Sequence, residues 1–516
     1  MKKVLFPLVL IASIVGLASC NKDQQTSSIR LTATIEDCTD IQSPKTVLNS
    51  TALEWVAGDE IRVYGFYASN SAVFTATPQS PATTAIFSTT DPEFNDVGSY
   101  VAYYPASANV DAFHIVLPTT QVSEDGSLRN FPMHAVNLSG PNLQFHNLCG
   151  LLKINLQETG KTITSIALTT DQAINGRYEV HNVNNEGTLP SLGDVQSGTE
   201  SSTTTLVCNQ DISTAHDFYI YLPENEYTGL TLTITASDGT VCTKTANTTI
   251  SVVRSQYTTI TLSSNSLQFH PVGSKGGLFT INTDGDQVWF SQGNLQYQAS
   301  TGTWHLAENQ YDYVGGDNEN ISAAYSGWID LFGFGTGSNP TLSTTTANPD
   351  YSTFVDWGTN AIVNGGNQSG LWRTLDVNEW NYLFNTRTDA SLKYGTGNIC
   401  GLGGLIILPD SWTIPEGCSF TPGFTTYGAD ADWSRNSYNS AQWDRMEAAG
   451  AVFLPAAGGR NHGMISGNGT RGYYWSSTHY GLGTAGCVAF ASYRFWSFDY
   501  WDGAGGSSVR LVRDND

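Results

Sequence analysis

Short runs in which apolar and polar side chains alternate dominate the first half of the chain. The clearest run begins at Ile29, and its odd-numbered positions are apolar through Ile35. A two-residue period turns one side of each run toward a core and therefore predicts β-strands. Polar, glycine and proline residues separate the runs, and no long pattern with a helical period competes. Further strands are expected at 59–67, 99–104, 151–156, 217–222, 230–236 and 257–262.

The spacing of these runs predicts the fold class of the first half. Short strands at regular intervals are typical of antiparallel β-sandwiches. We expect two such domains, at 29–137 and 138–263, because polar and proline residues between Pro132 and Pro141 give the best internal boundary. The protein is therefore expected to be mainly β.

The pattern changes in the second half, residues 279–516, which follows a polar, glycine-bearing linker expected at 264–278. Apolar residues there recur at helical spacing in two short stretches, 378–384 and 442–449, which predict helices. Strands are expected at 288–297, 452–458 and 509–513. Because helices and strands are mixed, we expect a third, α+β domain.

The N-terminus has the pattern of an export signal. Lys2 and Lys3 precede an apolar run from Val4 to Gly16 that is too short to span a bilayer comfortably, so residues 1–19 predict a signal peptide. The small residues before Cys20 resemble the lipobox of bacterial lipoproteins. The resemblance implies acyl chains such as palmitate on Cys20, a tether over residues 20–28 and a lipid-anchored location. The alternative is an ordinary secreted protein with an incidental cysteine.

Composition narrows the choice of partners. With 23 Lys and Arg against 46 Asp and Glu, the formal net charge is −23. Nucleic-acid binding needs a basic surface, and so does electrostatic attachment to anionic lipid, so neither is expected. Charged residues make up only 13% of the chain and aromatic residues 11%, which is typical of a β-rich surface protein.

Seven cysteines besides Cys20 have no metal-binding spacing, and an odd number cannot all pair within one chain. An exported location permits disulfides, and Cys400 with Cys418 is the most plausible local pair. Buried free thiols are the alternative for most of them. The remaining five are Cys38, Cys149, Cys208, Cys242 and Cys487.

An ordered set of motifs in the first half resembles the fimbrillins of Bacteroides-type pili. The motifs are Trp55–Tyr64, Tyr103–Pro105, Leu117-Pro118 with Gln121, Phe145–Ile154 and Ile166–Leu168. The resemblance covers residues 29–263 and implies export to the outer membrane, with other fimbrial subunits as partners. Many fimbrillins assemble by donor-strand exchange after a cut at an arginine. Arg30 is the candidate for that cut; the alternative is a solvated residue at the start of a strand.

A second set of motifs resembles the Fibrobacter succinogenes major paralogous domain and its Bacteroidales surface-lipoprotein relatives, which are similar to the C-type-lectin-like fold. The motifs are Trp372–Leu375, Glu379–Leu383, Leu454–Gly458, Tyr474–Thr478 and Ser508–Asp514. The resemblance covers residues 279–514 and implies a loop-rich ligand-binding face. The calcium-binding motifs of sugar-binding lectins and the catalytic cysteines of formylglycine-generating enzymes are missing. We therefore expect no enzyme, and a formylglycine-generating type is kept only as a remote alternative.

Between the last two motifs, residues 476–508 contain no Lys, Glu, Gln or Met. Adenine-directed mutagenesis by a diversity-generating retroelement leaves out these types and Trp, so Trp496 and Trp501 do not fit that interpretation. Val488 and Phe490 alternate with small residues, as if two inward anchors carried an exchangeable face. Aromatic and arginine side chains here have the composition of interface hot spots, and core packing is the alternative. The candidate ligand-binding residues are His479, Tyr480, Leu482, Thr484, Tyr493, Arg494, Phe495, Trp496, Phe498, Asp499, Tyr500, Trp501 and Asp502.

Two further sequence patterns bear on nucleotide or metal sites, and neither predicts one. Residues 481–486 match GxGxxG, but the run that follows alternates like a strand and opens no helix, so a dinucleotide site is not expected. Scattered histidines give no HExxH and no close Cys/His pair, so we expect no metal and no cofactor.

The sequence as a whole predicts a lipid-anchored outer-membrane or cell-surface adhesin. Its ligand, which the sequence does not identify, is expected to be a protein or a glycan bound through the C-terminal face. The alternative is a structural fimbrial subunit.

Overall fold

The alternating pattern of β1 (Ile29–Ile35) shows how the sequence builds the first unit. Leu31, Ala33 and Ile35 are buried while the residues between them face outward, because successive side chains of a strand point to opposite faces. In this computed structural model β1 closes a seven-stranded barrel with an aromatic core around Trp55. The structure describes residues 28–40, 53–66, 70–77, 81–124, 127–246, 248–264, 267–343, 354–425, 432–461, 463–481 and 483–515.

The strands expected from alternation are confirmed, and the chain is mainly β. Around the barrel, β1 is followed by β12 (Asn142–Asn147), β11 (Met133–Asn137), β6 (Tyr100–Tyr104), β3 (Glu60–Gly65), β4 (Ser71–Ala76) and β5 (Thr84–Thr89). The seven strands form one sheet that closes on itself, and β1 pairs in parallel with β12 and antiparallel with β5.

The second unit is built from sheets that pack around a separate aliphatic core. Its largest sheet runs β10 (Ser127–Leu128), β9 (Thr120–Glu124), β17 (Thr203–Asp211), β14 (Thr162–Thr169), β20 (Thr231–Ala236), β21 (Thr240–Thr245) and β24 (His270–Pro271). A four-stranded sheet runs β18 (His216–Leu222), β13 (Gly150–Leu156), β23 (Gln256–Leu262) and β2 (Thr39–Asp40). A small sheet of β19 (Asn225–Tyr227) with β22 (Ile250–Val252) packs on the same core. A further sheet runs β16 (Ser191–Val195), β15 (Gly176–His181), β8 (His114–Leu117) and β7 (Asn109–Asp111), and its buried residues pack into the aromatic core of the barrel instead.

Strand pairing does not follow the boundary expected between residues 137 and 138. β12 lies after that boundary but completes the barrel, whereas β2, β8 and β9 lie before it but pair with β23, β15 and β17, which lie after it. Several of these pairs are parallel, so the sheets are mixed and not purely antiparallel as expected. The first two units therefore have interleaved strands.

A half-buried ion pair joins the two interleaved units. Glu36, just after β1, lies 2.8 Å from the guanidinium of Arg254 and accepts a hydrogen bond from the backbone N–H of Asn147. Burial opposes ionisation of Glu36, but the nearby His146 ring and the hydrogen-bonded guanidinium of Arg254 outweigh it and lower its pKa to about 2. The ionised carboxylate is thus held between the end of β1 and the start of β23.

Glu36→Gln is expected to lower the free energy of unfolding by about 2 kcal/mol at pH 7, after allowance for partial solvent screening. Because the folded-state pKa is lowered, this stabilisation is present in full above about pH 4.5, the ordinary glutamate value, and is lost as the pH falls toward about 2. Urea melts at several pH values should show the difference between wild type and variant shrinking over that range. Glu179→Gln, at an exposed site, is the control and should shift stability by no more than about 0.5 kcal/mol.

The C-terminal unit contains two α-helices among its described residues, α1 (Val377–Asn385) and α2 (Ser440–Ala448), which confirms both helix predictions. Asp376 caps α1 by accepting hydrogen bonds from two backbone N–H groups, and Glu379 completes a capping box. Trp380, Leu383 and Phe384 are buried on one face, as their spacing predicted. Neither helix is long and apolar enough to cross a membrane.

The remaining strands of this unit form five small sheets within the described residues. They are β25 (Ser274–Thr280), β26 (Gln287–Ser291), β40 (Leu511–Asp514) and β30 (Arg373–Thr374); β28 (Thr303–Leu306), β27 (Leu295–Gln298) and β29 (Trp328–Ile329); β33 (Ser437–Tyr438), β31 (Tyr394–Ile399), β32 (Leu402–Ile407) and β34 (Val452–Pro455); β35 (Gly459–Asn461) and β36 (Met464–Ser466); and β37 (Arg471–Gly481), β38 (Thr484–Ala491) and β39 (Arg494–Asp502). Short 3₁₀ helices occur at Gly315–Asn320, Trp357–Thr359 and Ala390–Leu392.

The expected linker at 264–278 is partly wrong. β24 still belongs to the second unit, and β25 begins only three residues later, at Ser274. Gly277 is packed so closely against Gly450 and Pro409 that an added Cβ would lie 2.4 Å from the carbonyl oxygen of Gly450. The connection is therefore short and its second half is part of the C-terminal unit.

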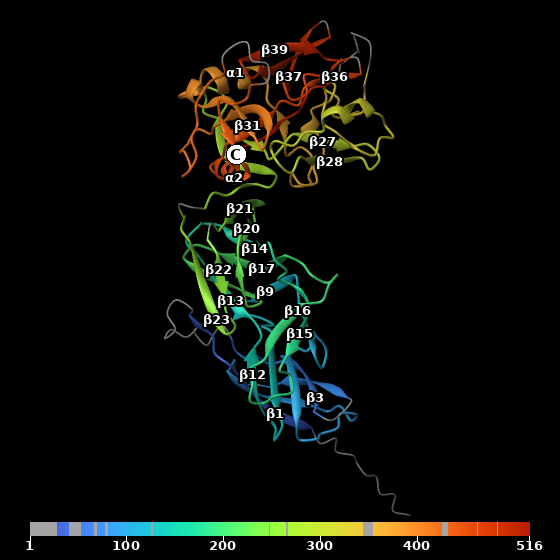
Figure 1. Cartoon of the computed structure of the whole chain (residues 1–516), viewed down its shortest axis with the longest axis vertical. Helices are drawn as coiled ribbons and strands as arrows, with labels where there is room; N and C mark the ends of the chain where they lie inside the picture. Colours follow the sequence, from blue (N-terminus) through green and yellow to red (C-terminus); the bar gives the residue numbers. More distant parts are fainter. Residues whose placement is uncertain are drawn as a thin grey trace, which may run out of the picture.

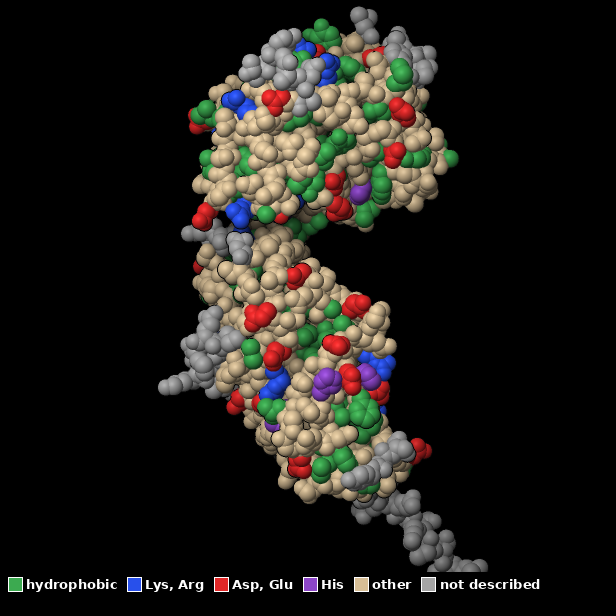
Figure 2. Space-filling model, viewed as in Figure 1, with side chains coloured by type: hydrophobic (Ala, Val, Ile, Leu, Met, Phe, Trp, Pro, Cys, Tyr) green, Lys and Arg blue, Asp and Glu red, His purple; other side chains and the backbone are tan. Residues whose placement is uncertain are grey.

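The units follow one another along a long axis (Figure 1). The barrel with β1 and β3 lies at one end, and β37 and β39 of the C-terminal unit lie at the other. The surface narrows where the C-terminal unit meets the second unit, and uncharged atoms cover most of the visible face (Figure 2).

Candidate binding site

The three-stranded sheet β37–β38–β39 carries most of the predicted ligand-binding residues. Its central strand is buried on both faces: Val488 and Phe490 pack into a core with Trp380, while Ala485 and Cys487 pack into a second core with Trp475. We call these the helix-side face and the tryptophan face. The expectation that the small residues of β38 form an exchangeable outer face is wrong, because a second layer of the unit covers them.

A β-bulge in β39 changes which residues share a face. Cys487 pairs with Asp499 and Ala489 pairs with Trp496, so Ser497 and Phe498 both stand opposite the single residue Val488. Such a bulge interrupts the alternation of side chains. Ser497 contacts α1, and the Phe498 ring lies 3.4 Å from the position a Cβ would take on Gly486, so both side chains lie on the helix-side face.

Three aromatic residues gather beyond this bulge and form what we call the aromatic platform. Tyr480 of β37 and Tyr500 of β39 are nearly parallel, with ring centroids 5.8 Å apart and 6° between the planes. Phe498 lies 5.4 Å from Tyr480 and 6.4 Å from Tyr500. The tyrosines are 57% and 58% exposed, so the platform is open to solvent although its rings support one another.

Gly486 makes room for the platform. It pairs with Tyr500 in the central strand, and a Cβ there would lie 2.8 Å from the Ser476 hydroxyl and 3.4 Å from the Phe498 ring. The absence of a side chain at Gly486 therefore leaves space for the Ser476 hydroxyl and the Phe498 ring.

The exposed face of α1 borders the platform with amide side chains. Asn385 Nδ2 donates hydrogen bonds to Asn381 Oδ1 and to Ser497 Oγ, each at 2.8 Å. At the other end of the helix, the backbone N–H of Val377 donates to Thr478 Oγ1 of β37 at 3.1 Å. The helix thus spans the sheet, and Asn378, Asn381 and Asn385 form what we call the amide stripe.

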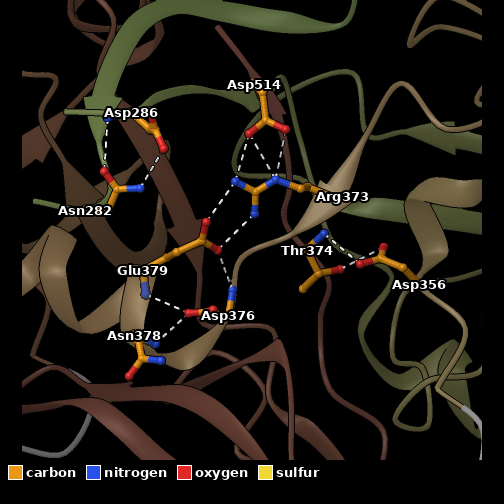
Figure 3. Close-up of polar contacts among 9 residues, drawn as sticks. All are labelled: Asn282, Asp286, Asp356, Arg373, Thr374, Asp376, Asn378, Glu379 and Asp514. Atoms are coloured by element: carbon orange, nitrogen blue, oxygen red, sulfur yellow. Dashed lines mark hydrogen bonds and ion pairs between the residues drawn. The ribbon is translucent and has the colours of Figure 1, made fainter. Parts of the chain in front are cut away.

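Arg373 holds this helix in place (Figure 3). Its guanidinium donates to Glu379 in the first turn of α1 at 2.8 and 2.9 Å and to Asp514 of β40 at 2.8 and 3.0 Å. Burial disfavours the charged guanidinium, but the two carboxylates more than compensate and raise the pKa of Arg373 above its usual range. Asp356 supports the same strand by accepting from the backbone N–H and hydroxyl of Thr374.

Two of the predicted binding residues, Phe495 and Trp501, are half-buried and pack against the cores of the unit. Phe495 lies on the helix-side face within a ring cluster, 4.5 Å from Phe384 and 5.9 Å from Phe424 between centroids. Trp501 lies on the tryptophan face, 4.5 Å from Tyr473. Apolar contacts on these faces hold both rings in the scaffold.

Other predicted residues lie on the tryptophan face or serve turns. Arg494 places its guanidinium 3.9 Å from the Trp496 ring centroid and 5.6 Å from that of Tyr493, in register with Ala491 and away from the platform. Asp499 pairs with Cys487. Thr484 donates to the carbonyl of Gly481, Asp502 accepts from the backbone of Ala504, and the exposed His479 ring lies 6.2 Å from Phe334. Among the described residues, the structure therefore gathers Tyr480, Phe498 and Tyr500 in one group and Tyr493, Arg494 and Trp496 in another.

The remaining predicted sites, Cys487 apart, lie outside the β37–β38–β39 sheet or outside the described residues. Arg30 is exposed in β1 and pairs with Ser88. Cys20 and Leu482 lie outside the described residues. Cys400, Cys418 and the other five described cysteines are free thiols, and burial raises the pKa of Cys208 to about 11. In the parts of the chain that the structure covers, no three His, Cys, Asp or Glu side chains gather as a metal site would require.

Sequence reasoning missed Ser497, Gly486 and the amide stripe. The asparagines at 378, 381 and 385 have helical spacing, and that spacing was a usable signal for a shared exposed face. Nothing in the sequence marks the bulge that brings Ser497 to α1.

Comparisons with known proteins found similar solved structures but no matching protein family. No protein-family profile and no curated protein matches the chain. The chain is similar to a Bacteroides ovatus structure named "putative cell adhesion protein" (10% identity, TM-score 0.31, covering 47% of this chain and 94% of that one). A Bacteroides uniformis structure of the same name gives 20% identity, TM-score 0.31 and coverage of 48% and 96%. A Bacteroides ovatus "fimbrial protein" gives 12% identity, TM-score 0.23 and coverage of 93% and 98%.

Proposed function

We propose that the protein is a lipid-anchored cell-surface adhesin that binds its ligand through the aromatic platform. One observation carries this proposal: three aromatic rings support one another, two of them exposed, on β37 and β39, which lie at the end of a long molecule opposite to β1 (Figure 1). Aromatic residues on a rigid support are typical of binding hot spots. A tether at the N-terminal end would hold this face away from the membrane.

Binding by the platform is tested with the purified full-length protein in detergent, on arrays of surface proteins and glycans. Tyr480→Ala combined with Tyr500→Ala is expected to weaken binding at least about tenfold, because truncating hot-spot aromatics commonly costs 2 kcal/mol or more. Met464→Ala is the matched control, since Met464 is 68% exposed in the same unit but belongs to the β35–β36 hairpin. Unchanged affinity in the double variant would rule out the platform as the binding face.

Lipid attachment has its own test. Cys20→Ser is expected to release the protein from the membrane fraction, because the thioether-linked acyl chains would have no attachment point. Fractionation and incorporation of labelled palmitate measure this, and Cys38→Ser, at a buried cysteine of the barrel, is the control. A Cys20→Ser protein that still sediments with outer membrane and takes up label would refute lipid anchoring.

A fimbrial subunit is the second candidate function, and the sequence motifs of the first half favour it. Donor-strand exchange needs a strand to leave and open a sheet edge. A cut after Arg30 would leave Leu31–Ile35 paired with β5 and β12, so the barrel would stay closed. We therefore propose Arg30 only as a trimming site; formation of polymers after cleavage there would favour the fimbrial alternative.

A further inference from the structure

We propose that the ligand of the platform is a neutral sugar ring of a glycan, held between the aromatic platform and the amide stripe of α1. This inference rests on the proposed binding function and adds the chemical class of the ligand. The observation behind it is that flat aromatic rings and uncharged amide and hydroxyl groups lie next to each other at the bulge of β39.

The aromatic platform supplies the apolar half of such a site. Tyr480 and Tyr500 are parallel within 6° and each exposes more than half of its surface. The face of an aromatic ring carries partial negative charge, which suits the weakly positive C–H groups on one face of a pyranose. With centroids 5.8 Å apart, the rings leave no room for a sugar between them, so the ring would lie on their outer surface.

The amide stripe supplies the polar half. Ser497 and the bulge bring α1 next to Phe498, and the two amides already bond to each other through Asn385 Nδ2 and Asn381 Oδ1. Within the described residues, no hydrogen bond uses Asn381 Nδ2 or Asn385 Oδ1. The two N–H donors of Asn381 Nδ2 and the acceptor Asn385 Oδ1 therefore remain, and sugar hydroxyls can satisfy both kinds of group because a hydroxyl donates and accepts.

Charges near this surface are engaged elsewhere. Glu379 is paired with Arg373, and Asp376 caps the helix. Arg494 and Asp499 lie in register with Ala491 and Cys487, residues of the tryptophan face. Among these described charged residues, none would offer an acidic sugar or a sulfate a cation on the helix-side face, which favours a neutral ring.

The test uses the full-length protein in detergent and an array of neutral hexose and N-acetylhexosamine oligosaccharides, with sialylated and sulfated glycans alongside. Neutral members should bind, equally in calcium and in EDTA because the platform and stripe supply no carboxylate for a metal. Calorimetry with the best neutral oligosaccharide should show at least about tenfold loss in Tyr500→Ala and about three- to tenfold loss in Asn381→Ala. Met464→Ala should bind as wild type, and thermal melts confirm that each variant is folded.

The other outcomes distinguish a wrong ligand class from a wrong binding face. No binding to any neutral member at millimolar concentration, binding to acidic glycans alone, or strict dependence on calcium would overturn the sugar assignment. If a protein ligand is found and Tyr500→Ala abolishes its binding, the sugar assignment fails while the platform stands. If a neutral glycan binds but neither Tyr500→Ala nor Asn381→Ala weakens it, the platform itself is wrong.

Discussion

Phe495→Ala is expected to lower the free energy of unfolding of the C-terminal unit by about 3 kcal/mol. The Phe495 ring packs against Phe384, Tyr394 and Phe424 beneath α1, and truncating a phenylalanine in a core typically costs about 3–5 kcal/mol. The lower end of that range is expected because the side chain is only partly buried. Denaturant melts followed by tryptophan fluorescence measure the loss.

Phe498→Ala, three residues along the same strand, is the matched comparison. Its described ring contacts are with the two exposed tyrosines, so a stability change below about 1 kcal/mol is expected. Ligand binding should show the reverse order, with the larger loss in Phe498→Ala. Equal destabilisation by the two variants would mean that the platform belongs to the core.

Arg373→Ala is expected to cost about 3 kcal/mol and to weaken ligand binding as well. The substitution leaves Glu379, whose side chain is only 17% exposed, without its partner, and breaking a buried pair commonly costs about 3–5 kcal/mol. It also removes the contact that holds the first turn of α1 to β40, so the amide stripe would lose its fixed position (Figure 3). Urea melts and calorimetry on the same samples measure the two effects.

Arg373→Lys is the control for geometry. A lysine keeps the charge but cannot bond two carboxylates in the forked arrangement of a guanidinium, so partial recovery is expected. A stability loss below about 0.5 kcal/mol in Arg373→Ala would show that the network is an ordinary surface ion pair.

The individual strands and helices could be predicted because each depends on a short-range pattern of apolar and polar residues. The period of β1 and the helical spacing of Trp380, Leu383 and Phe384 each determine a buried face without reference to the rest of the chain. The interleaving of the first two units could not be predicted, since β2, β8 and β9 pair with strands more than 50 residues away and their sequences do not specify a partner. The ordered start of β25 was mistaken for a linker because its glycines serve close packing.

The candidate site was predictable in composition but not in geometry. The density of aromatic residues between 493 and 502 indicated an interface, and three of the residues chosen do form the platform. Strict alternation would place Phe498 and Trp496 on one face of the sheet, whereas the bulge at Ser497 puts them on opposite faces. Because a single inserted residue reverses every later side chain of a strand, no pattern confined to β39 could have assigned the faces.

The position of β1 has a mechanical consequence for a protein held at one end and bound at the other. A pull that enters at residue 28 and leaves through the platform would run along β1, whose two neighbours grip it over most of its length (Figure 1). Hydrogen bonds across a strand that is pulled lengthwise share the load, whereas a strand peeled from one end loses them one at a time. The hydrogen bonds that pair β1 with its two neighbours would thus let the molecule bear tension between an anchor at the N-terminal end and a ligand bound at the far end.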